Sequence, residues 1–117
     1  MAIVEDINTS ILSKALDAAV LRQQAIAQNL ANVNAPGYRR LTVQFEADLA
    51  AALHGGQAAH VGRLHPRLVQ APHAEGNQGT DDELARLSEA VLHHHALVTV
   101  LNRRIELIGT AISEGKK

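Results

Sequence analysis

The chain has 117 residues, a net charge of −1, no cysteine, and only one tyrosine and one phenylalanine. The near-neutral charge gives no electrostatic basis for binding nucleic acid or an anionic membrane surface. The lack of cysteine excludes disulfides, thiol catalysis and thiolate metal sites. The apolar residues are mostly Ala, Leu, Ile and Val, which favour seams between helices, and small cores of this kind often need an oligomer to be stable.

The N-terminus has no basic region followed by an apolar core, so we expect no cleavable secretory signal. No apolar run is long enough for a transmembrane helix. If the protein leaves the cytoplasm, it is expected to use a route that does not read such a signal.

The first long helix is predicted over residues 9–33, after a loose leader at 1–8. Asn8, Thr9 and Ser10 are all suitable N-caps. Mostly apolar residues then recur in alternating steps of four and three, which is a heptad stripe on one helical face. The stripe consists of Leu12, Leu16, Ala19, Gln23, Ile26, Leu30 and Val33.

A strong helix-terminating signal follows this helix. Pro36 pushes the preceding residue out of the helical region, and Pro36-Gly37 is the central pair of a type II turn. Tyr38 comes directly after the turn, so the turn fixes where a large amphipathic ring points. Asn29 and Asn32 lie three residues apart beside the apolar stripe. On these residues alone, a purely structural turn is the simpler interpretation.

The middle of the chain is predicted to hold little regular structure. Alternation over 41–45 indicates a short half-buried strand, and a spacing of four after Phe45 indicates a short helix over 46–53. Residues 54–79 are rich in Gly and His and show no period, so we expect a mobile loop in the free monomer. Within it, Leu64, Leu68 and Val69 could form a strand once a partner supplies an edge.

The second long helix is predicted over residues 81–113. Thr80 and Glu83 form a capping box at its start, and Asp81 and Asp82 suit the positive end of a helix. A heptad stripe then continues over more than four repeats. It consists of Leu84, Leu87, Val91, His94, Val98, Leu101, Ile105, Ile108 and Ile112.

These stripes predict a mainly α fold, in which the two terminal helices pair as an antiparallel coiled coil around a short, loop-rich middle segment. The longer second helix would overhang the first, or its surplus seam would meet another subunit. The expected divisions are an N-terminal helical segment at 1–35, a middle region at 36–79 and a C-terminal helix at 80–117.

No constellation of residues predicts catalysis or a metal site. Consecutive residues His93, His94 and His95 point about 100° apart on a helix, so they cannot converge on one ion. We expect His94 in the seam and the other two at the surface. The loop histidines have no familiar ligand spacing. Arg39 and Arg40 are expected to be solvated or paired with a neighbouring subunit's acids.

A motif placed about 25 residues into a helical N-terminus resembles the signature of flagellar axial proteins. It reads Ala27-x-Asn29-Leu30-Ala31-Asn32-x-x-x-Pro36-Gly37-Tyr38. The small middle segment narrows the resemblance to the flagellar basal-body rod proteins, specifically the proximal rod protein (FlgB type). The closely related distal neighbour in the rod has a similar N-terminal block and is the second choice within the family. The second half offers two further similarities, Gly76-Asn77-Gln78 and Ala96-Leu97-Val98-x-x-Leu101. The chain departs from the family at Ala35, where threonine is usual, and at His94, where tyrosine is usual.

The resemblance implies a structural subunit, not an enzyme, with no cofactor and no small-molecule substrate. Such subunits polymerise through their terminal helices into the periplasmic rod of the basal body, which transmits torque from the motor ring to the hook. The implied partners are copies of itself, other rod subunits, and membrane-ring, export-gate or rod-adaptor proteins. The flagellar type III apparatus would export it.

The residues expected at the assembly interface are those of the two seams and the turn: Leu12, Leu16, Ile26, Asn29, Leu30, Asn32, Val33, Pro36, Gly37, Tyr38, Leu84, Leu87, Val91, His94, Val98, Leu101, Ile105, Ile108 and Ile112. A rival hypothesis, a cytoplasmic helical adaptor or export chaperone, explains the seams equally well but not the turn motif. A weaker third reading is a His-rich metal carrier.

Overall fold

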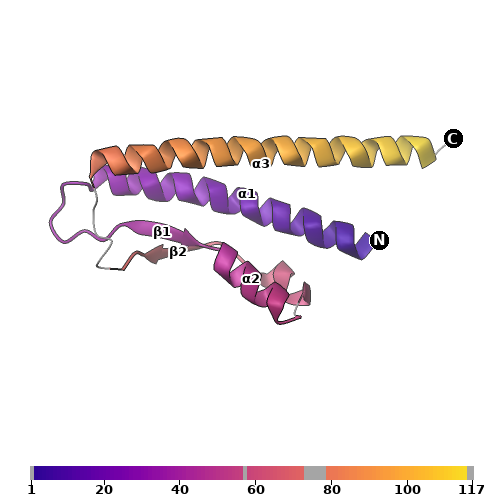
Figure 1. Cartoon of the computed structure of the whole chain (residues 1–117), viewed down its shortest axis with the longest axis horizontal. Coiled ribbons are helices and arrows are strands. Elements are labelled where there is room, and N and C mark those ends of the chain that lie inside the picture. Colours follow the sequence, from indigo (N-terminus) through magenta and orange to yellow (C-terminus); the bar gives the residue numbers. More distant parts are fainter. Residues whose placement is uncertain (1, 57, 73–78, 116–117) are drawn as a thin grey trace.

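A computed structural model describes residues 2–56, 58–72 and 79–115, and two long antiparallel helices dominate it (Figure 1). Helix α1 spans Ala2–Ala31 and helix α3 spans Thr80–Gly115. The elements between them are β1 (Leu41–Gln44), α2 (Glu46–His54), the 3₁₀ helix η1 (Ala58–Arg63) and β2 (Arg67–Gln70). The mainly helical fold predicted from the two stripes is therefore confirmed.

The molecule is elongated, because the long helices lie along one axis. Its extents are 64 × 30 × 15 Å. Its radius of gyration is 17.7 Å, against roughly 13 Å for a compact domain of about 100 residues. The start of α1 and the end of α3 lie at the same end of the molecule (Figure 1). We call this the open end, because the two helices diverge toward it, and the opposite end the closed end.

Helix α1 is the middle layer of the structure, with α3 on one side and the small sheet, α2 and η1 on the other (Figure 1). Its buried residues are mostly small: Ala18, Ala19 and Ala25 are buried with Ile26. Small side chains allow elements on both sides to approach the helix closely. The position of α1 therefore explains why an alanine-rich helix forms the centre of this chain.

Strands β1 and β2 form a two-stranded antiparallel sheet, with Leu41 opposite Gln70 and Gln44 opposite Arg67. Among the described residues, Phe45, directly after β1, has the largest fully buried side chain. Val61 from η1 and Ala52 from α2 are buried as well. The single phenylalanine thus lies in the small core of the middle segment, whereas the two long helices have no aromatic residue in their seam.

The predicted start of the first helix was wrong. Helix α1 begins at Ala2, not near Asn8, and continues through Thr9 and Ser10 to Ala31. The first proline and glycine of the chain are Pro36 and Gly37, so nothing earlier breaks the helix. Residues that favour caps cost a helix interior less than a kcal/mol (about 0.7 at most each), so they do not stop a helix by themselves.

Residues 54–79 hold more structure than expected. The 3₁₀ helix η1 and strand β2 lie within this range. Leu68 and Val69 do form a strand, but its edge partner is β1 of the same chain and not another subunit. Residues 57 and 73–78 of the predicted loop lie outside the described residues. The sequence does not predict the pairing of β1 with β2, because this Gly- and His-rich segment shows no regular spacing of apolar residues.

The capping box predicted at Thr80 and Glu83 was also wrong. The backbone N–H of Glu83 donates to the carbonyl oxygen of Gly79 at 3.2 Å, which makes Gly79 the N-cap and Thr80 the first helical residue. The Glu83 carboxylate is buried against an arginine and does not act as a helix cap. Asp81 and Asp82 remain in the first turn of α3, where they suit the helix dipole.

Two ion pairs hold α2 against its neighbours. Arg22 of α1 donates to the Glu46 carboxylate, and Arg67 of β2 donates to Asp48 at 3.3 Å. Burial alone would raise the pKa of Glu46, but the hydrogen bond and positive charge of Arg22, together with a backbone hydrogen bond, outweigh burial and lower this pKa. The pKa of Asp48 is lowered chiefly by the hydrogen bond from Gln44. Both carboxylates therefore favour the folded state in their charged form.

Gly37 and Gly109 offer a matched test of the turn. Gly37 has φ +74°, whereas Gly109 is helical, and an added Cβ would meet nothing within 4 Å at either site. We expect Gly37→Ala to lower the free energy of unfolding by about 1 kcal/mol through backbone strain, and Gly109→Ala to raise it by up to about 1 kcal/mol. Urea unfolding of both variants measures the difference, and shifts of the same sign would contradict the turn assignment.

Candidate assembly interface

The chain reverses direction after α1 through a proline–glycine turn. The Tyr38 N–H donates to the Ala35 carbonyl oxygen at 3.2 Å, and Gly37 has the positive φ that the third position of a type II turn requires. The end of α1 itself is satisfied by Asn32, whose side-chain Nδ2 donates to the Gln28 carbonyl oxygen at 2.8 Å. The sequence motif is therefore a helix stop followed by a defined turn, as predicted.

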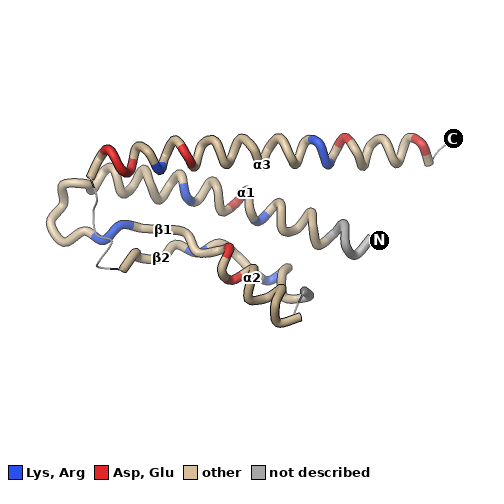
Figure 2. The backbone as a smooth tube through the Cα atoms, in the orientation of Figure 1, with Lys and Arg blue, Asp and Glu red and all other residues tan. Residues whose placement is uncertain are grey.

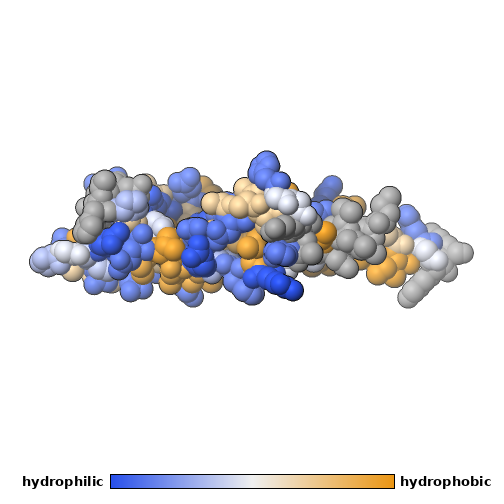
Figure 3. All heavy atoms as spheres, turned by 90° about the horizontal axis from the view of Figure 1, so that it is seen from below, coloured by the Kyte–Doolittle hydropathy of each residue, from blue (hydrophilic) through white to orange (hydrophobic). Residues whose placement is uncertain are grey.

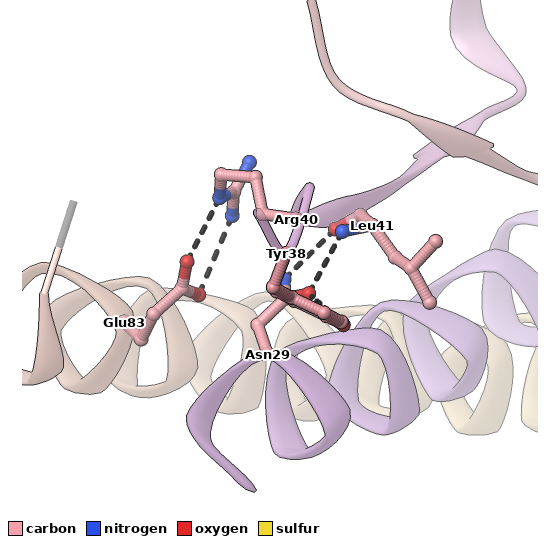
Figure 4. A network of polar contacts seen from close by, with 5 residues as sticks. All are labelled: Asn29, Tyr38, Arg40, Leu41 and Glu83. Atoms are coloured by element: carbon pink, nitrogen blue, oxygen red, sulfur yellow. Dashed lines mark hydrogen bonds and ion pairs between the residues drawn. The ribbon is translucent and has the colours of Figure 1, made fainter. Parts of the chain in front are cut away.

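Asn29 holds the chain after the turn against α1 (Figure 4). Its side-chain Nδ2 donates to the Leu41 carbonyl oxygen at 2.9 Å, and its Oδ1 accepts from the Leu41 N–H at 2.7 Å. This two-bond pairing copies the exchange made by facing residues in an antiparallel sheet. Only a carboxamide can both donate and accept in this way. Asn29 is 1% exposed, so its side chain is used inside its own chain.

Tyr38 completes this network. Its hydroxyl donates to Asn29 Oδ1 at 3.0 Å, so the ring that follows the turn points back to the end of α1 (Figure 4). Burial is the main reason that the pKa of Tyr38 is raised, and the negative charge of Glu83 raises it further, while Arg40 partly opposes the shift. The hydroxyl therefore stays protonated and able to donate at neutral pH.

A buried ion pair joins the same region to the start of α3. Arg40 Nε donates to Glu83 Oε1 at 2.8 Å, and Arg40 Nη2 donates to Glu83 Oε2 at 3.4 Å. The side chains are 4% and 0% exposed. Among the described residues, no buried side-chain nitrogen or oxygen lacks a hydrogen-bond partner. The pair spans 43 residues of sequence and fixes where α3 begins relative to α1.

The prediction for the two consecutive arginines was wrong. Arg40 is buried with Glu83, and Arg39 donates to the Ala71 carbonyl oxygen at 2.7 Å through Nη2. Neither is left for a neighbouring subunit's acids. Sequence reasoning also missed Glu83, because its place beside Asp81 and Asp82 made helix capping the simpler explanation for all three acids.

The stripe of α3 that faces α1 is shifted from the predicted one. The buried or half-buried positions of α3 follow steps of four and three that start one residue earlier. They are Glu83, Leu87, Ala90, His94, Leu97, Leu101 and Arg104, with Val98 beside them. Four members of the predicted stripe are thus half-buried, namely Leu87, His94, Val98 and Leu101. The shift follows from Glu83, whose pairing with Arg40 turns this face of the helix inward.

The rest of the predicted α3 stripe is exposed. A band of large apolar side chains runs along α3, on more than one side of the helix, and its members are between 41% and 71% exposed. The band consists of Leu84, Val91, Leu92, Val100, Ile105, Leu107, Ile108 and Ile112. Monomeric proteins rarely expose so many large apolar side chains on one element, and such surfaces mark interaction sites. Leu92, Val100 and Leu107 were not among the residues predicted from the sequence.

On α1 and in the turn, the predicted interface residues are mostly inside the chain. Ile26 and Asn29 are buried. Leu12, Leu16, Leu30, Asn32, Val33 and Tyr38 are half-buried, and Pro36 and Gly37 are exposed. The face on the sheet side of the molecule shows polar groups with apolar groups scattered among them and no single apolar band (Figure 3). These observations make α3 the main candidate interface.

The histidine run behaves as its spacing predicts. His94 is half-buried at the contact with α1, while His93 and His95 are exposed. Within residues 2–56, 58–72 and 79–115, no three His, Cys, Asp or Glu side chains come together in a way that could hold a metal ion. In the same ranges, no helix combines the length and apolar character needed to cross a membrane.

Comparison with known proteins found a similarity to a flagellar protein. No family model matches the chain. Over 56 residues the chain is 36% identical to the flagellar basal body rod protein FlgB of Borrelia hermsii. The matched part is 48% of this chain and 42% of that protein. The chain therefore spans less than half the length of the curated relative that it matches.

The buried ion pair gives a stability prediction. Glu83→Gln leaves the Arg40 guanidinium buried without its counter-charge, so we expect a loss of ~3–5 kcal/mol in the free energy of unfolding. Replacing both partners, Arg40→Met with Glu83→Leu, should cost clearly less. The neighbouring exposed Asp82→Asn is the control and should stay within about 0.5 kcal/mol of the parent. Urea unfolding would contradict this account if Glu83→Gln behaved like Asp82→Asn.

The titration of Tyr38, the only tyrosine, tests the hydrogen-bond network that it forms with Asn29. Its folded-state pKa lies above the usual 10.0, so the folded chain binds this proton more tightly than the unfolded chain. We therefore expect stability to fall as the pH rises from 10.0 through the raised value. Absorbance titration at alkaline pH, with and without urea, measures both midpoints. Tyr38→Phe should remove this pH dependence, and equal midpoints in the two solvents would count against the network.

Proposed function

We propose that the protein is a structural subunit of the bacterial flagellar basal-body rod, of the proximal type. The observation that best supports this proposal is the band of exposed large apolar side chains along α3. These side chains are uncovered in a single copy of the protein. In this proposal, the terminal helices of many copies and of other rod subunits cover these bands and form the rod. The rod would lie in the periplasm and transmit torque from the motor ring to the hook.

The similarity to FlgB supports this proposal from an independent direction. The motif from Asn29 to Tyr38 gives further support, because its two most characteristic residues form one hydrogen-bonded unit. That unit fixes the path of the chain as it leaves α1. A subunit whose helices and middle segment both take fixed positions in an assembly needs such a fixed connection between them.

The proposed role requires no enzyme activity, cofactor, metal or small-molecule substrate. The proposed partners are copies of the chain, other rod subunits, and membrane-ring, export-gate or rod-adaptor proteins. The proposed divisions of the subunit are the helical segments at 1–35 and 80–117 and the middle region at 36–79. In the assembly, the exposed apolar residues of α3 would contact neighbouring subunits, while the buried residues of α3 hold the subunit together.

The direct test is deletion of the gene in the source bacterium, followed by electron microscopy of isolated basal bodies. We expect the membrane ring to remain and the rod to be lost. Intact rods with normal hooks would refute the proposal and would favour a cytoplasmic helical adaptor that uses the same apolar band to bind another protein's helix.

A point variant separates assembly from folding. Ile105 is 57% exposed, so Ile105→Asp should leave the subunit folded, with little change in its circular dichroism, while the buried charge it would create in an assembly blocks rod formation. Asn102→Asp, an exposed polar position in the same half of α3, is the matched control. We expect loss of motility only with Ile105→Asp, and a motile strain carrying it would contradict the interface.

A further inference from the structure

The open end of the molecule contains an apolar groove between the first half of α1 and the second half of α3. Its volume is about 590 Å³. Its apolar lining consists of Ile11, Leu12, Ala15, Leu97, Val100 and Leu107. The α3 residues that line it run from Leu97 to Leu107, so the groove accepts roughly 15 Å of a further helix at 1.5 Å per residue.

The charged residues of this groove all have one sign. Arg103 and Arg104 line it, and none of its described lining residues is acidic. Arg104 Nε donates to Thr9 Oγ1 at 3.2 Å, so Arg104 links α3 to α1 across the groove. Arg103 is exposed beside it. A helix that fills this groove therefore needs an apolar stripe with a carboxylate beside it.

The start of α3 has this chemistry. Leu84 and Val91 are 47% and 48% exposed and lie seven residues apart on one face. Asp81 is exposed roughly 60° from Leu84 around the helix at 100° per residue, whereas Asp82 lies on the opposite side. We call Asp81, Leu84 and Val91 the acidic stripe. Figure 2 shows the acids at the start of α3 and the two adjacent arginines in its second half.

One copy cannot join its own groove and acidic stripe. Leu84 and Leu107 lie on the same straight helix, 23 residues apart, which corresponds to roughly 35 Å at 1.5 Å per residue. The two surfaces lie at opposite ends of the molecule and carry complementary charge and matching apolar character. A second copy displaced along the long axis brings them together.

We propose that the groove at the open end binds the acidic stripe of a second copy, head to tail. This proposal rests on the proposed rod role and adds which surfaces meet and in which direction copies follow one another. The two surfaces differ, so the contact leaves a free groove on one copy and a free stripe on the other. Such heterologous contacts repeat as a ring or an open filament and do not close as a dimer.

Cysteine cross-linking tests the contact, because the chain has no cysteine of its own. Copies carrying Leu84→Cys and copies carrying Leu107→Cys, with different tags, are produced together in a gene-deletion strain. Basal bodies are isolated and oxidised, and a disulfide needs the two Cα atoms within about 7 Å. We expect a cross-linked pair that carries both tags.

In the matched control, the first set of copies carries Leu92→Cys in place of Leu84→Cys. Leu92 is apolar and more exposed, at 71%, but lies roughly 80° away around the helix at 100° per residue. We expect at least fivefold less mixed-tag product with Leu92→Cys. Equal yields from both pairs, or no product from the Leu84 pair in motile cells, would overturn the head-to-tail contact.

A charge exchange tests the same contact without cross-linking. Asp81→Arg and Arg103→Glu should each reduce the number of flagellated cells at least tenfold, and the two together should restore most of it. Asp81→Arg with Arg86→Glu is the control, since it restores the net charge but not the contact, and it should stay defective. Rescue by Arg86→Glu, or no rescue by Arg103→Glu, would overturn the proposal.

The gene deletion distinguishes the two possible failures. If the deletion strain keeps its rods, the proposed function fails and the contact fails with it. If the deletion strain loses its rods, while the Leu84 cross-link and the charge rescue are both absent, the rod role stands and the head-to-tail contact is wrong.

Discussion

The carboxamide of Asn29 binds both backbone polar groups of Leu41, and the course of the chain after α1 depends on this pairing. It takes the place of a third strand at the edge of β1, since β2 occupies only the other edge. Tyr38 adds its hydroxyl to the same oxygen, and the Pro36-Gly37 turn brings that ring into reach. A helix end, a turn and a strand are thereby held together by three hydrogen bonds to one side chain.

The Arg40–Glu83 ion pair extends this arrangement to the second long helix. Because the pair is buried, its charges are worth little as a net source of stability, but either one alone would be costly. Its structural effect is to fix the rotation of α3. The helix turns Glu83 and Ala90 inward and leaves Leu84 and Val91 at the surface. One buried acid thus decides which apolar residues of α3 are available to other chains.

The two ends of the molecule differ as a result. The closed end has defined polar contacts between α1, β1 and α3. Toward the open end, the helices diverge, contacts between them include the Arg104–Thr9 hydrogen bond, and an apolar groove remains (Figure 1). A subunit built in this way has a fixed internal geometry and still presents apolar surface along α3. That combination suits a protein that is folded before it meets its neighbours and is completed by them.

The sequence by itself determined the two long helices, the turn between α1 and β1, the short strand and helix after it, and the mainly apolar seams. These follow from local rules: residue spacing, the absence of proline and glycine before residue 36, and the φ requirements of Pro36-Gly37. Only the tertiary structure decided the pairing of β1 with β2, the partner of Asn29 and the burial of Glu83. These contacts join residues 12 to 43 positions apart, and no local pattern marks them. The heptad stripe of α3 was read from hydrophobicity alone, and it was displaced because a long-range ion pair, which hydrophobicity does not include, set the rotation of the helix.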